Sequence, residues 1–282
     1  MNLIFANDTP DMKLIEKNQV PFLQFPILTE TGIVQHGFST RAGGVSKGIF
    51  QTMNLSFARG DKKEDVMENF RRMSAAIGVH TEDLVFSKQT HETNIRIVTE
   101  EDRGKGIVKS LDYDHTDGLI TNIAGLCLAT FYADCVPLYF VDPVHKAIGL
   151  SHSGWRGTVG KMGQKTLEKM NHEYGTKPEQ VIAAIGPSIC QECYEVSADV
   201  VAYFKKEFHP QYWCDLFYEK EDGKYQLNLW KANEIILREA GVPKEQIGMA
   251  NLCTCCNEKY LFSHRASQGK RGNLGGFLAL KS

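Results

Sequence analysis

Three residues with metal-binding side chains stand where predicted β-strands end. His91 comes just past the strand candidate Leu84–Lys88, and Cys135 follows the apolar run Leu126–Phe131. His152 closes another apolar run, Ala147 to Ser151. Strand ends are where ligand sites form in α/β folds, because loops converge there on a rigid sheet. Two imidazoles and a thiolate suit Zn²⁺ and leave its fourth position open for water, as in catalytic sites.

The same residue types have a structural interpretation. A single cysteine on an apolar strand is most often a small buried hydrophobe, and a single histidine is most often a surface or capping residue. No short-range ligand spacing of the His-Glu-x-x-His kind occurs beside these residues. Spacing alone therefore favours the structural interpretation over the zinc site.

Two arginines lie in glycine-flanked segments that suit an anion. Arg156 lies between Gly154 and Gly157, where a predicted strand turns into a helix, so backbone N–H groups and a guanidinium would face one ligand. A tight turn with Trp155 as a packing anchor is the alternative, and the sequence alone favours it. Arg41 precedes Gly43-Gly44 but lacks the spacing and lysine of a phosphate-binding P-loop.

Five further cysteines fall in two clusters, Cys190-x-x-Cys193 and Cys253-x-Cys255-Cys256. Together they have the ligands of a structural zinc site. The separation of the two clusters exceeds that of compact zinc ribbons, and the first cluster follows Gly-Pro like a turn. We therefore favour buried or partly exposed thiols without a metal.

The elements expected to position these residues alternate between strands and helices. Helices are predicted from Asp61 to Gly78, after Gly157, after Ser197 and after Asn228, with Asp61 and Glu64 forming a capping box. The stretch Phe217–Lys224 is predicted to be a loop. The predicted strands are Leu84–Lys88, Asn94–Val98, Gly118–Thr121, Leu126–Phe131, Leu138–Val141, Ala147–Ser151 and Val181–Ile185.

This pattern predicts one α/β domain over residues 1–282, with a central mixed β-sheet flanked by helices. Residues 1–31 are expected to form an N-terminal extension or edge elements. The sheet is expected to be mixed because only a few residues separate several of the strands.

Composition excludes several classes of protein. The chain has 282 residues with 34 acidic and 32 basic side chains, so no basic excess points to nucleic acid. The longest apolar stretch, Ile123–Phe140, is interrupted by Asp134 and Pro137, which argues against a membrane span. No apolar signal segment opens the sequence, so we expect a cytoplasmic protein with reduced thiols.

The motifs taken together resemble a known family. They occur in this order: Gly37–Ser46, Asn54–Ser56, Gln89-x-His91, Asp117–Leu119, Ala133–Pro137, His152–Gly157, Gly186–Ile189, Tyr194–Val196, Cys253-Thr254 and Phe262–Arg265. The chain resembles the YfiH/YlmD-like purine nucleoside phosphorylase family, formerly labelled the polyphenol oxidase or laccase domain. The resemblance extends from about Gly32 to the C-terminus.

The resemblance implies a zinc site made by His91, Cys135 and His152, with copper as an adventitious substitute. It implies phosphorolysis of adenosine, inosine, guanosine and methylthioadenosine, and deamination of adenosine. We expect a monomer or homodimer. Purine nucleosides and phosphate would then contact side chains near the metal; the candidates are Arg41, Gln89, Arg156 and Arg265. The segment Gly269–Asn273 departs from the family's Gly-Arg element, so no role is carried onto Arg271.

Three other functions compete with this interpretation. Cys135 and His152 could form the thiolate–imidazole pair of a cysteine hydrolase or deamidase, which does not need His91. A copper-dependent polyphenol oxidase, the older family label, is disfavoured because none of the nine histidines forms a His-x-His pair. A metal-binding protein without catalytic activity is the third alternative.

Overall fold

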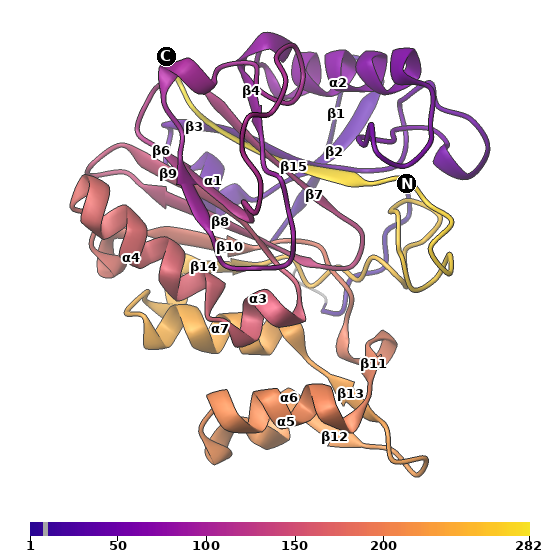
Figure 1. Ribbon diagram of the computed structural model, residues 1–282, viewed down its shortest axis with the longest axis vertical. Coiled ribbons are helices and arrows are strands. Elements are labelled where there is room, and N and C mark those ends of the chain that lie inside the picture. The colour runs from indigo at the N-terminus through magenta and orange to yellow at the C-terminus, as the bar shows by residue number, and fades with distance from the viewer. Residues whose placement is uncertain (8–10) are drawn as a thin grey trace.

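The computed structural model describes residues 1–7 and 11–282. Its centre consists of two six-stranded mixed sheets that stack face to face (Figure 1). The first sheet has the order β1 (Lys13–Lys17), β2 (Val20–Gln24), β3 (Val34–Ser39), β15 (Leu274–Leu280), β7 (Cys127–Tyr132) and β4 (Leu84–Phe86). The second has the order β14 (Ile247–Met249), β10 (Ile182–Ile185), β8 (Val136–Asp142), β9 (Ala147–Ser153), β6 (Gly118–Thr121) and β5 (Ile95–Ile97).

Helices cover the outer face of each sheet. In Figure 1, α2 lies over the first sheet, and α3, α4 and α7 lie on the opposite side, over the second. The helices are α1 (Pro26–Thr29), α2 (Lys63–Ile77), α3 (Trp155–Val159), α4 (Met162–Tyr174), α5 (Ala198–Glu207), α6 (Trp213–Leu216) and α7 (Leu229–Glu239). Short 3₁₀ helices span Gly48–Phe50, Thr81–Asp83, Glu100–Asp102, Pro178–Gln180, Gln191–Cys193, Pro210–Tyr212 and Lys244–Gln246.

The two-residue period of the strands explains why each sheet is buried on both faces. In β7, Cys127 and Ala129 pack against the α2 side, whereas Leu128 and Tyr132 face the second sheet. Apolar residues on both faces of such strands read as continuous apolar runs, as the sequence shows. The four layers therefore enclose one core between the sheets and one under each helical layer.

Most local predictions are confirmed, and the start of the first long helix is corrected. Helix α2 buries Phe70 and Met73 as predicted and ends at Gly78, whose φ of 86° is left-handed. The predicted capping box is wrong, because the N-cap is Lys62 without a side-chain cap. The Asp61 carboxylate instead accepts hydrogen bonds from side chains of the preceding loop. The predicted cap of α7 is confirmed, since the Asn228 side chain accepts the N–H of Lys231 at 3.0 Å.

A small third sheet extends from the main body together with α5 and α6 (Figure 1). Its order is β11 (Glu195–Val196), β13 (Tyr225–Leu227) and β12 (Phe217–Glu219). The predicted loop over Phe217–Lys224 is therefore wrong in its first three residues, which form an antiparallel pair with β13.

The predicted α/β class and mixed sheet are confirmed, but the strands are divided between two large sheets where one central sheet was expected. Strands β1 and β2, from the first 31 residues, form one edge of the first sheet. The C-terminal strand β15 lies in the middle of that sheet, between β3 and β7. None of the helices in the described residues is long and apolar enough to cross a membrane.

Candidate metal centre

The fold brings together His91, Cys135 and His152, which are far apart in the sequence. Their ligand atoms all lie within 4.8 Å of one another. His91 lies in the loop after β4, Cys135 in the turn that joins β7 to β8, and His152 near the end of β9. His152 is one residue inside its strand, because β9 continues to Ser153 where the sequence predicted an end at Ser151.

Backbone geometry leaves room for these side chains to meet. Helix α3 begins at Trp155, so Gly154 forms the junction with β9. A Cβ atom on Gly154 would lie 3.1 Å from Cys135 Sγ and 3.2 Å from His91 Cδ2. Both distances are tighter than ordinary van der Waals contact. Glycine at this position therefore keeps open the space in which the three ligands converge.

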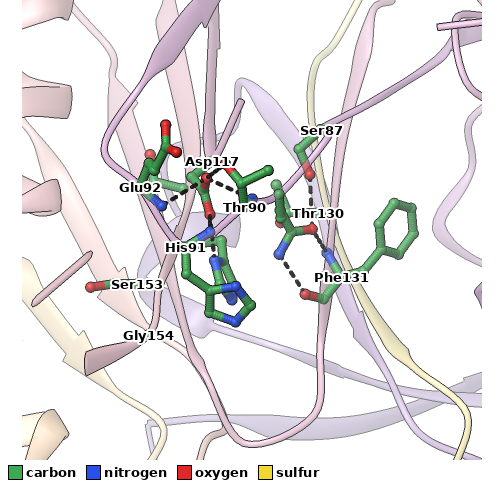
Figure 2. A network of polar contacts seen from close by, with 12 residues as sticks. Ser87, Thr90, His91, Glu92, Asp117, Thr130, Phe131, Ser153 and Gly154 are labelled. Carbon is green, nitrogen blue, oxygen red and sulfur yellow. Dashed lines mark hydrogen bonds and ion pairs between the residues drawn. The ribbon is translucent and has the colours of Figure 1, made fainter. Parts of the chain in front are cut away.

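Asp117, just before β6, contacts the loop that carries His91 (Figure 2) and also the side chain of His152. Its buried carboxylate accepts the N–H groups of Thr90, His91 and Glu92 at 3.0 to 3.1 Å. It also accepts from Nδ1 of His152 at 2.9 Å. His91 has a left-handed backbone with φ of 65°, unusual for a residue other than glycine, and these hydrogen bonds hold that turn. One side chain thus orients both histidines.

The electrostatics of the centre favour a thiolate. Burial acts to raise the pKa of the Cys135 thiol, but the neighbouring imidazoles of His152 and His91 outweigh it and lower the pKa below its ordinary value. Burial also acts to raise the pKa of Asp117, and its hydrogen bonds with His152 and the N–H groups of the 90–92 loop reverse that effect. The carboxylate is therefore charged at neutral pH and the thiol is prepared for metal binding, which requires the deprotonated form.

The donor set fits a metal ion of the zinc or copper type. Because Nδ1 of His152 is hydrogen-bonded to Asp117, Nε2 is the atom left to bind a metal, an arrangement typical of metal-binding histidines. His91 is exposed and His152 is buried, so the centre has an open side toward solvent. Three protein ligands with an open side match a catalytic zinc site better than a closed structural one.

A cavity of about 350 Å³ opens onto this centre. Tyr132 lines it beside the three ligands; its ring centroid lies 5.6 Å from that of His152. The cavity volume is at the lower end of the range for small-molecule sites. A larger hollow of about 810 Å³ shares Lys88 with it but is lined by neither histidine nor cysteine. The candidate metal-binding side chains therefore line the smaller of these two cavities.

Gln89, a predicted substrate contact, lines the cavity but its amide is engaged with the protein. Its Oε1 accepts from Phe131 N at 2.8 Å and from Ser87 Oγ at 2.9 Å, and its Nε2 donates to Phe131 O at 2.7 Å. Figure 2 shows these contacts at Ser87 and Phe131. The side chain thereby ties the loop that carries His91 to strand β7.

The three arginines predicted to contact substrate do not line this cavity. Arg41 donates to two backbone carbonyl groups at 2.8 and 3.0 Å, and Arg265 to two others at 2.9 and 3.1 Å. Arg156 stacks on Trp155, with 4.3 Å between its guanidinium carbon and the ring centroid. Their assignment as substrate contacts stays a prediction.

Arg271 lines the cavity, although no role is predicted for it from the sequence. It donates to the side chain of Asn273, and its buried Nε has no partner among the described residues. Burial and the nearby Arg59 lower its pKa to about 10, so it carries a positive charge at neutral pH. The departure of Gly269–Asn273 from the family pattern concealed this residue, and only strand β15 brings it beside the metal centre.

Comparison with known proteins identifies the family. A protein-family model described as multi-copper polyphenol oxidoreductase laccase matches residues 35–281 of the chain. Purine nucleoside phosphorylase YlmD of Bacillus subtilis is 36% identical over 247 residues, covering 87% of this chain and 88% of the relative. Adenosine deaminase RL5, from an unknown prokaryotic organism, is 34% identical over 230 residues, covering 81% and 87%. The crystal structure of YlmD from Geobacillus stearothermophilus matches with a TM-score of 0.89 at 33% identity, covering 97% of this chain and 100% of that one. The chain therefore belongs to the YlmD- and YfiH-like family, whose model bears the laccase description and whose relatives include proteins named as nucleoside-processing enzymes.

Proposed function

We propose that this protein is a zinc-dependent purine nucleoside phosphorylase that also deaminates adenosine. The substrates proposed are adenosine, inosine, guanosine and methylthioadenosine. The observation that carries the proposal is the convergence of His91, Cys135 and His152 at one cavity, in a chain whose relatives are named phosphorylases and a deaminase. When bound there, Zn²⁺ supplies Lewis acidity and lowers the pKa of water toward neutrality.

In phosphorolysis, a phosphate oxygen forms a bond to C1′ of the ribose while the bond from C1′ to the purine nitrogen breaks. The electron pair of that bond leaves with the purine, and ribose 1-phosphate is released. The protein must therefore neutralise the charge of phosphate close to the sugar. Arg271 is placed for this task, because it is cationic, lines the cavity and has a buried N–H without a partner among the described residues.

The activity is tested by incubating zinc-loaded protein with adenosine or inosine, with and without inorganic phosphate, and separating the products by chromatography. We expect free base and ribose 1-phosphate only when phosphate is present, and inosine from adenosine without phosphate. Chelated, metal-free protein is the matched control and should form none of these products. An absence of all three products from protein with zinc bound at His91, Cys135 and His152 would contradict the proposed function.

Replacing Arg271 with alanine is expected to raise the KM for phosphate about 10- to 100-fold, because one hydrogen bond between charged groups is lost. Deamination of adenosine, which uses no phosphate, should change much less. Lys270→Ala is the matched control, since Lys270 is exposed and does not line the cavity. Arg41→Ala and Arg156→Ala belong in the same assay. An unchanged KM for phosphate in Arg271→Ala would refute this assignment.

One observation favours a second candidate, a cysteine hydrolase or deamidase. Cys135, His152 and Asp117 stand in the order nucleophile, base and orienting carboxylate, which cysteine hydrolases use. This function gives His91 no task, whereas a metal centre uses it as a ligand. The hydrolase is favoured if metal-free protein is fully active and iodoacetamide inactivates it. Any oxidation of phenols by copper-loaded protein would be attributed to copper substituting at the same three side chains.

A further inference from the structure

A second group of metal-binding side chains lies outside the site described above. Its ligand atoms, like those of the first group, all lie within 4.8 Å of one another. The members belong to two Cys-x-x-Cys pairs and form what we call the four-cysteine cluster: Cys190, Cys193, Cys253 and Cys256. All four cysteines are free of disulfide bonds.

The fold brings the two Cys-x-x-Cys pairs together in space, although their long separation in the sequence argued against a shared zinc site. Strands β10 and β14 pair in parallel, and each leads into one Cys-x-x-Cys pair. The pairing continues beyond the strands as a bridge between Ser188 and Cys253, with Thr254 N donating to Ser188 O at 3.1 Å. The two pairs therefore follow the C-terminal ends of two neighbouring parallel strands and lie side by side. In a compact zinc ribbon a short loop joins the two pairs of ligands. Here two adjacent parallel strands bring the two pairs together.

The spacing of the sulfur atoms matches tetrahedral coordination. Four thiolates about 2.3 Å from a zinc ion have sulfurs about 3.8 Å apart. Cys256 Sγ lies 3.5 Å from Cys193 Sγ and 4.0 Å from Cys190 Sγ. These separations bracket the tetrahedral value and exceed the length of a disulfide bond of about 2.05 Å.

Backbone N–H groups point at one of these sulfurs, as expected for a thiolate ligand. Cys253 is buried, and its Sγ accepts the N–H of Cys190 at 3.3 Å and that of Cys256 at 3.4 Å. Hydrogen bonds donated to sulfur stabilise its charged form. One N–H group from each Cys-x-x-Cys pair therefore points at the sulfur of Cys253.

We propose that the four-cysteine cluster holds a structural zinc ion, separate from the centre at His91, Cys135 and His152. Four sulfur ligands fill all tetrahedral positions and leave none for water or substrate, which is the arrangement of a structural site. The proposal does not depend on the nucleoside activity.

The proposed zinc site is connected to the turn that carries Cys135. The adjacent residue, Asp134, accepts from Thr254 Oγ1 at 2.6 Å through its carboxylate and from Ile189 N at 3.0 Å through its carbonyl. Thr254 lies inside one Cys-x-x-Cys pair and Ile189 directly precedes the other. Ordering of the four-cysteine cluster by zinc would therefore hold the β7–β8 turn, so Cys135 keeps its position.

Metal counting on the intact protein tests the proposal. Protein purified from zinc-supplemented cells is expected to contain two zinc ions per chain, and the Cys135→Ala variant one. X-ray absorption of that variant should show four sulfur neighbours at about 2.3 Å and no nitrogen neighbour. A single ion per wild-type chain that Cys135→Ala removes would overturn the proposal. So would a disulfide between cluster cysteines, detected by mass in freshly purified protein.

Variants of the cluster provide the second test. Cys190→Ser and Cys256→Ser are expected to lose one zinc ion per chain, to lower the Tm by about 10 °C and to keep the ion at the first centre. Cys214→Ser is the matched control, because Cys214 is exposed and lies outside the cluster. If a cluster variant does not fold, the metal count and absorption spectrum of Cys135→Ala decide alone. Retention of two ions by folded Cys190→Ser and Cys256→Ser would overturn the proposal.

Discussion

Replacing Cys135 with alanine is expected to lower kcat/KM for phosphorolysis at least about a thousandfold. Cys135 is the one thiol among the three candidate ligands, and the imidazoles beside it lower its pKa and so favour the deprotonated form that metal binding requires. Loss of the metal removes several kcal/mol of charge stabilisation from the transition state, which corresponds to a factor of about a thousand in rate. Steady-state kinetics and metal analysis on the same preparation measure both effects.

The His91→Ala variant shows whether the loss of activity in Cys135→Ala comes from a metal centre or from a cysteine hydrolase. In a metal centre, His91→Ala removes a ligand and should lower activity at least about a hundredfold. In a cysteine hydrolase formed by Cys135 and His152 alone, the same variant should keep most of its activity. Cys214→Ala, on the exposed face of α6, controls for loss of a thiol elsewhere. Full activity of Cys135→Ala would contradict both functions.

The sequence predicts where His91, Cys135 and His152 lie for a simple physical reason, whereas their interpretation as metal ligands depended on the family resemblance. Strand boundaries are readable from apolar runs, and polar residues at the ends of neighbouring strands converge in space. That reasoning locates His91, Cys135 and His152, which the structure brings together. The strand containing His152 is longer than predicted, but the shift of two residues leaves the side chain at the same sheet edge.

The roles of Asp117 and Arg271 were not predicted, because both depend on contacts between segments that are distant in the sequence. Asp117 reads as an ordinary acidic residue before a strand, and its role depends on the 90–92 loop folding over its carboxylate. Arg271 reaches the cavity only because β15 inserts between β3 and β7, a pairing that no local pattern indicates. Division of the strands into two sheets has the same cause: periodicity shows that a segment is a strand, but it does not show which strand is its neighbour.

Replacing Asp117 with asparagine is expected to weaken the candidate metal centre without removing any of its three donor side chains. The carboxylate accepts hydrogen bonds through both oxygens: Oδ1 from the His91 N–H and His152 Nδ1, and Oδ2 from Thr90 and Glu92. Asparagine offers one acceptor oxygen, and its NH₂ group would face N–H donors on the other side. Either the left-handed turn at His91 or the orientation of His152 would lose its support.

We expect Asp117→Asn to weaken zinc binding at the first centre about 10- to 100-fold and to lower the free energy of unfolding by about 2 to 3 kcal/mol. Competition with a chelator measures the affinity, and denaturant unfolding of the metal-free protein measures the stability. Asp114→Asn is the matched control: it removes the same charge three residues away, from an exposed side chain that forms an ion pair with Lys88 at 3.8 Å. Should Asp117→Asn bind zinc as tightly as Asp114→Asn, Asp117 does not position the histidines. Because the loss of affinity is smaller than in Cys135→Ala, excess zinc should restore most of the activity of Asp117→Asn but none of the activity of Cys135→Ala.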